Sequence, residues 1–210
     1  MIIPLRFSDS TCILLKSLLN STCEASGTLH VDMNKRLLSV ADNVQIGQMD
    51  CVPIPNGLFV FHTHPNRMEG VSLEEAFIDF PSENDVYTFL CDPTCLAHYV
   101  ITHSGVYRMA MPDSSKPNDS EEIDNIASGF CALLDRVRTM IVDKKMQISK
   151  VRTEYLLGAR RLGVHIHHFR KIEEIREDIS ICLTSNPSKK LKHRRNSISN
   201  QDESNCRNLK

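Results

Sequence analysis

LFVFHTHPNRMEGVSLEEAFIDFPSENDVYTFL, residues 58–90, is the stretch around which the rest of the chain is interpreted. It opens with the apolar run 58–61, which predicts a buried strand, and Pro65 ends that strand. Side chains alternate between the two faces of a strand, so His62 and His64 point to the same face. Two imidazoles on one face supply two of the ligands that a zinc site needs.

The second half of this stretch predicts a helix that begins beside Pro81. Ser82 and Asp85 have the spacing of a capping box, in which each side chain accepts a hydrogen bond from the other residue's backbone N–H. A capping box alone would explain the pair. Together with the two histidines, Asp85 completes two imidazoles and one carboxylate, a ligand set of catalytic zinc sites, and we favour this interpretation.

Apolar periodicity in the rest of the chain predicts a mixture of strands and helices, and therefore an α/β fold. Gly163 is suited to end one of these helices as its C′ residue. Besides the strand and helix above, we expect strands over 23–31, 36–44, 96–102, 105–111 and 164–169, and helices over 10–20, 121–145, 148–162 and 171–178.

The length of 210 residues suits one domain with additions, and 41% apolar residues are enough for a core. We expect a catalytic core over 1–112, a helical extension over 113–183 that packs on it, and a disordered basic tail over 184–210. The N-terminus has no secretory pattern, no run is long enough for a membrane span, and the eight cysteines are scattered. These features predict a cytoplasmic or nuclear protein without a membrane partner.

The positive charge of the second half is concentrated in the predicted tail. The run 189–195, KKLKHRR, is typical of a nuclear-localisation patch or a nucleic-acid contact, and a solubilising tail is the alternative. Ser197 follows Arg194 and Arg195 in the pattern of a basophilic kinase site. A phosphate there would add roughly −2 charge and weaken either role of the patch.

Two further groups of metal-binding residue types occur. Cys91, Cys95, His98 and His103 have finger-like chemistry, but the gap between the cysteine pair and the histidine pair is too short for the usual finger. The segment 165–168, HIHH, repeats the alternating histidines, but no acidic residue in motif context follows it closely. We expect free thiols in the first group and exposed strand histidines in the second.

The stretch 58–90 resembles the JAMM motif of the MPN (JAB) metalloprotease family, in which a distant Glu precedes H-[ST]-H-P and S-x-x-D. The distant Glu has a counterpart in Glu24, within Glu24-Ala-Ser-Gly-Thr-Leu29. By this resemblance His62, His64 and Asp85 bind one Zn²⁺, Glu24 is the general acid and base, and Ser82 supports the oxyanion. The resemblance covers roughly residues 5–112 and implies an MPN fold, an α/β domain with a curved, mostly antiparallel sheet flanked by helices and followed by a C-terminal helical extension.

The spacing of the motif is the one departure. Ser82 lies 18 residues after His64, whereas the usual family spacing would select Ser72 and Glu75. We favour Ser82 and Asp85, because they have the Pro-Ser preamble, the correct acid and an apolar helix behind them. Residues 66–80 are then an insertion, and the chain resembles the long-loop form found in JAB-like proteins of large DNA viruses.

The resemblance implies a zinc isopeptidase that removes ubiquitin or a ubiquitin-like modifier from lysine, with such conjugates as partners. The residues themselves imply only metal-assisted hydrolysis of an amide. Two other functions stay open at this point. One is a non-catalytic MPN scaffold, which would pair with a second MPN or scaffold protein, and the other is a peptide or small-molecule amidohydrolase of the bacterial type.

Overall fold

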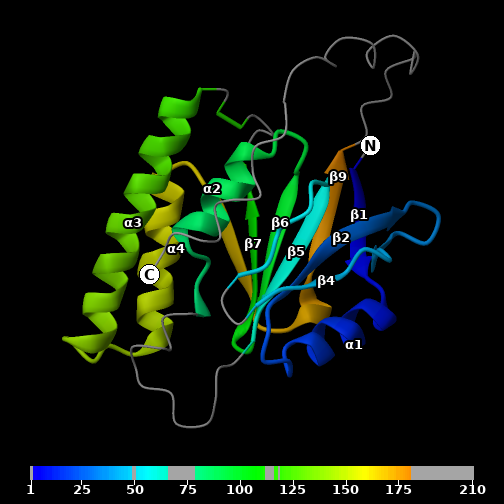
Figure 1. Cartoon of the computed structure of the whole chain (residues 1–210), viewed down its shortest axis with the longest axis horizontal. Helices are drawn as coiled ribbons and strands as arrows, with labels where there is room; N and C mark the ends of the chain where they lie inside the picture. Colours follow the sequence, from blue (N-terminus) through cyan, green and yellow to red (C-terminus); the bar gives the residue numbers. More distant parts are fainter. Residues whose placement is uncertain (1, 49–50, 66–78, 112–115, 118, 181–210) are drawn as a thin grey trace.

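The computed structural model describes residues 2–48, 51–65, 79–111, 116–117 and 119–180. A nine-stranded sheet runs through this part of the chain in the order β8-β7-β6-β5-β2-β3-β1-β9, and β4 pairs with β2 beside this path (Figure 1). The strands are β1 (Ile2–Phe7), β2 (Ala25–Asp32), β3 (Leu37–Val40), β4 (Gln45–Ile46), β5 (Phe59–His64), β6 (Ala97–Thr102), β7 (Gly105–Ala110), β8 (His165–Phe169) and β9 (Arg176–Ser180).

The sheet is mostly antiparallel, as expected. Only the pairs β1–β3 and β5–β6 are parallel among the described strands. The helices are α1 (Asp9–Leu18), α2 (Glu83–Cys91), α3 (Ser120–Val142) and α4 (Ile148–Arg161), and all four lie where the sequence predicts a helix. Gly163 has a φ of 85°, the left-handed conformation that ends α4.

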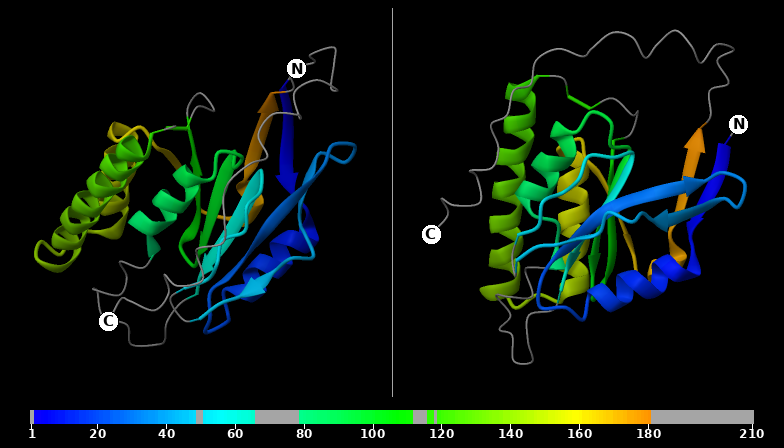
Figure 2. Two further views of the ribbon diagram at one scale, coloured as in Figure 1. Left: turned by 45° about the horizontal axis from the view of Figure 1, so that its top comes forward. Right: turned by 45° about the vertical axis from the view of Figure 1, so that its right-hand side comes forward.

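Both faces of the sheet are covered, which explains the apolar character of β5. On one face, Val60 and Val100 pack beneath α2, α3 and α4. On the other face, Phe59 and Phe61 pack with residues of α1 (Figures 1 and 2). His62 follows the alternation of Val60 and therefore lies on the face beneath the three helices.

The sequence prediction is wrong at both ends of the described chain. The expected helix over 171–178 is a 3₁₀ turn, Ile172–Glu174, followed by strand β9. β1 was not expected either. It pairs antiparallel with β9, which is the last strand at that edge of the sheet. The predicted extension therefore contributes more than helices, because β8 and β9 both complete the sheet of residues 1–112.

A buried ion pair explains why the segment around Glu177 is a strand. Arg108 on β7 donates to both carboxylate oxygens of Glu177, and the hydroxyl of Tyr99 donates to Glu177 Oε2 at 2.7 Å. Glu177 is 4% exposed. Burial, followed by the neighbouring Glu177, raises the pKa of Tyr99 well above its usual range, so the phenol keeps the proton that it donates.

The basic run 189–195, the rest of the tail 184–210 with Ser197, and residues 66–78 of the insertion lie outside the described residues. No helix among the described residues combines the length and apolar character that crossing a bilayer requires.

We predict that Arg108→Met lowers the free energy of unfolding by about 3 kcal/mol, because it leaves the Glu177 carboxylate buried without its cation. Arg136→Met is the matched control. Arg136 pairs with Glu154 on an exposed surface, where such a pair contributes little. Urea denaturation of the full chain measures both. Equal stability of the Arg108 variant and the control would contradict a stabilising role for the buried pair.

Candidate metal centre

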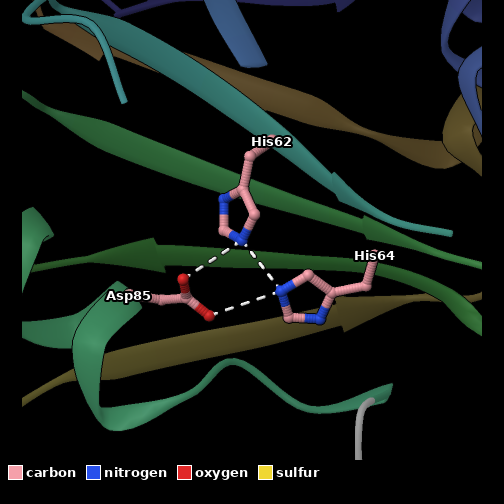
Figure 3. Close-up of side chains that lie close together, drawn as sticks. All are labelled: His62, His64 and Asp85. Atoms are coloured by element: carbon pink, nitrogen blue, oxygen red, sulfur yellow. Dashed lines mark hydrogen bonds and ion pairs between the residues drawn. The ribbon is translucent and has the colours of Figure 1, made fainter. Parts of the chain in front are cut away.

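The two histidines of β5 converge through one nitrogen each. His62 Nε2 lies 2.9 Å from His64 Nε2 (Figure 3). His62 is 1% exposed, and the His64 side chain is 9% exposed. The alternation of β5 thus places both rings on the same face of the strand, as the sequence predicts. His62 lies in the core, and His64 lies closer to its edge.

Asp85 reaches the same point from the first turn of α2. Its Oδ1 lies 3.1 Å from His62 Nε2, and its Oδ2 lies 3.5 Å from His64 Nε2. The three donor atoms lie within 4.8 Å of one another, and this is the only such group of His, Cys, Asp and Glu found in the described part of the chain. The structure therefore brings together the three residues predicted as ligands.

Asp85 is held in place by the capping box that the sequence offered as the simpler explanation. Ser82 N–H donates to Asp85 Oδ2 at 2.7 Å, and Asp85 N–H donates to Ser82 Oγ at 3.1 Å. The two interpretations are thus compatible in one structure. Oδ2 accepts the hydrogen bond at the helix start and also faces His64, while Oδ1 faces His62.

The charges at this point favour a cation. Burial alone would raise the pKa of the Asp85 carboxyl, but the adjacent His62 and His64 outweigh it and hold that pKa well below its usual range. Asp85 is therefore a carboxylate at neutral pH. Two imidazoles and one buried carboxylate are a donor set that Zn²⁺ accepts with one coordination position left for water.

His98 belongs to this site, whereas the sequence analysis placed it only in the finger-like group of cysteines and histidines. Its Nε2 lies 2.8 Å from Nδ1 of His62, and the residue is 0% exposed. Burial, followed by the neighbouring His62, lowers the pKa of His98 well below its usual range, so its ring is neutral. The available signal was the alternation of β6, which places His98 and Val100 on the same face as His62.

Helix α4 anchors the segment that leads into α2. The Tyr155 hydroxyl donates to the Pro81 carbonyl at 2.9 Å, and Phe80 stacks against Tyr155 with ring centroids 4.9 Å apart. Arg152 lies 3.5 Å from Asp79 Oδ2 and donates to the Tyr107 hydroxyl at 2.9 Å. The start of α2, and with it Asp85, is therefore positioned by a helix from the C-terminal part of the chain.

Glu24 immediately precedes β2, where the sequence analysis placed it within a strand. Its backbone pairs with the β4 segment, through Glu24 N–H to Gln48 O at 2.9 Å and Gly47 N–H to Glu24 O at 2.8 Å. In the β2–β5 register Ser26 lies opposite His62, and continuing this register by two residues beyond the paired segment would bring Glu24 opposite His64. Opposite residues of an antiparallel pair share a face.

The other candidates do not converge on a metal. In the Cys/His group, Cys91 is exposed, Cys95 is buried, His98 contacts His62, and His103 bonds to the Leu19 carbonyl at 3.0 Å. On β8, the ring of His168 bonds to the carbonyl of Ser104 at 3.1 Å. Ser72 and Glu75, the alternative to Ser82 and Asp85, lie outside the described residues.

No protein-family model matches the chain, and no curated protein sequence matches it. The geometry of the site itself therefore defines it as a candidate metal centre, a buried group of two histidines and one aspartate that can bind a metal ion.

We predict that the full chain binds about one Zn²⁺ and that Asp85→Asn weakens the affinity by at least about 100-fold, more than loss of an outer-shell partner would. Elemental analysis and competition with a chromogenic chelator measure stoichiometry and affinity. Glu83→Gln is the matched control, because Glu83 is an exposed acid of the same helical turn.

The same titration decides between the two spacings of the motif. Glu75→Gln is expected to keep the zinc affinity of the unmodified chain. Retention of zinc by Asp85→Asn together with its loss in Glu75→Gln would overturn the assignment of Asp85.

Proposed function

We propose that the chain is a zinc-dependent isopeptidase that removes ubiquitin or a ubiquitin-like modifier from lysine. The observation that carries the proposal is the convergence of His62, His64 and Asp85 in one buried group. The JAMM-like order of these residues, with Glu24 ahead of them, supplies the reaction class and the substrate class. The MPN identity of the fold is part of the same proposal, and the curved, mostly antiparallel sheet with flanking helices supports it.

In this reaction His62, His64 and Asp85 would hold the zinc ion. When bound, such an ion polarises a carbonyl group and lowers the pKa of its bound water to about 7. The role of the ligands is to fix three coordination positions and leave a fourth open. Their burial beneath α2 keeps bulk solvent away from one side of the site.

Glu24 is the proposed general base and then general acid. It is half-buried and lies opposite His64 in the extended strand register, beside the ligands but outside the group of converging donor atoms. A carboxylate in that position takes a proton from the attacking water and delivers it to the departing lysine amine. Proton transfer of this kind contributes about 10²- to 10⁴-fold to the rate.

Ser82 is the proposed oxyanion donor. Its Oγ accepts the N–H of Asp85, which fixes the position of the oxygen at the start of α2. A hydroxyl that accepts one hydrogen bond still has its own O–H to donate. A donor held in advance near the developing negative charge stabilises the tetrahedral intermediate.

We predict that Glu24→Gln lowers the rate of cleavage by about 10²-fold or more, because the amide cannot accept the proton. Zinc binding is expected to be retained. A panel of di-ubiquitin linkages and ubiquitin-like conjugates provides the assay, and zinc content is measured on the same preparation. The matched control is Glu83→Gln, the same change at an exposed acid of α2.

The outcomes separate the three functions. Cleavage of a conjugate that requires Glu24 supports the isopeptidase. Zinc binding with hydrolysis of short peptide amides but of no conjugate would identify an amidohydrolase instead. A folded chain that binds no zinc would exclude the enzyme and leave the scaffold.

A further inference from the structure

The two ring nitrogens of His62 have separate partners. Nε2 faces His64 Nε2 at 2.9 Å and Asp85 Oδ1 at 3.1 Å, which is the metal-binding side. Nδ1 faces His98 Nε2 at 2.8 Å, on the opposite side of the ring. The rings of His62 and His98 meet edge to face, with centroids 4.9 Å apart. His98 therefore lies directly behind a predicted ligand, and it is not itself a ligand.

The position of one proton connects these contacts. A metal binds a lone pair, so a neutral His62 that offers Nε2 to a metal must carry its proton on Nδ1. The group 2.8 Å from Nδ1 must then accept that proton in a hydrogen bond. His98 Nε2 accepts only when it is unprotonated, which places the proton of the neutral His98 ring on Nδ1.

Nδ1 of His98 is the second observation. It is buried, and it is the one buried side-chain nitrogen or oxygen in the described part of the chain that has no hydrogen-bond partner. An unpaired polar group in the core lowers stability, and an apolar side chain would fill the same space without that cost. Packing alone therefore does not account for an imidazole at this position, whose recorded polar contact is with His62.

We propose that His98 is a positioning residue of the metal centre: its Nε2 accepts the Nδ1–H of His62 and so holds the His62 ring in the orientation and tautomer that present Nε2 to the metal. The proposal rests on the metal site proposed above, but it does not depend on the substrate. Hydrogen-bond partners of this kind commonly change metal affinity by 10- to 100-fold. Here the acceptor is a second buried imidazole, so it adds no negative charge to the site.

Zinc affinity of the full chain tests the proposal, measured by competition with a chromogenic chelator. His98→Leu is expected to raise the zinc dissociation constant by about 10- to 100-fold. His98→Gln is expected to recover part of the affinity, because its amide oxygen accepts a hydrogen bond. His103→Leu is the matched control and should bind zinc as the unmodified chain does, since the recorded hydrogen bond of His103 goes to the Leu19 carbonyl and not to His62, His64 or Asp85.

Two further measurements separate positioning from packing. The urea midpoint of each metal-free variant reports packing, and it should not fall in proportion to the loss of zinc affinity. Nitrogen NMR of the histidine rings in the zinc-loaded, unmodified chain reports the tautomers directly. It should show protons on Nδ1 of both His62 and His98, and no proton on Nε2 of either ring.

Undiminished zinc affinity in His98→Leu, or a proton on His98 Nε2 in the zinc-loaded chain, would overturn the proposal. A loss of affinity fully matched by a lower urea midpoint would also overturn it, as would a chain that binds no zinc. A chain whose zinc affinity depends on His98 as expected, but which cleaves no conjugate, would contradict the isopeptidase alone.

Discussion

The carboxylate of Asp85 is the group on which the arrangement of the site depends. Oδ2 closes the capping box at the start of α2 and lies near His64, while Oδ1 faces His62. If α2 began at a different residue, the carboxylate of Asp85 would therefore move away from the two histidines. Backbone N–H groups at a helix N-terminus favour a negative charge, and this supports the same ionised state that a metal requires.

The C-terminal part of the chain is built into this arrangement. Tyr155 and Arg152 on α4 hold the segment that enters α2, and Tyr155 does so through the carbonyl of Pro81, the residue before the helix cap. β8 and β9 complete the two edges of the same sheet. The contacts that position Asp85 therefore cross the predicted boundary after residue 112. The parts of the chain on the two sides of this boundary form one structure.

The two histidines of the candidate metal centre differ in their surroundings. His62 is enclosed in the core and backed by His98, whereas the His64 side chain retains some exposure, and a continued β2–β5 register would bring Glu24 opposite it. A rigid, enclosed ligand can define where the metal sits. The more open side, beside Glu24, is where a substrate carbonyl and an attacking water would have to meet.

The sequence by itself determined which three residues form the candidate metal centre and where the four helices lie, because both depend on local spacing: alternation in H-T-H, a capping box in S-x-x-D, and apolar residues at helical intervals. Only the tertiary structure decided that 176–180 is a strand, that β1 pairs with it, and that His98 stands behind His62. These features depend on partners far along the chain, such as Arg108 for Glu177, and local periodicity carries no information about which distant strand will supply the partner.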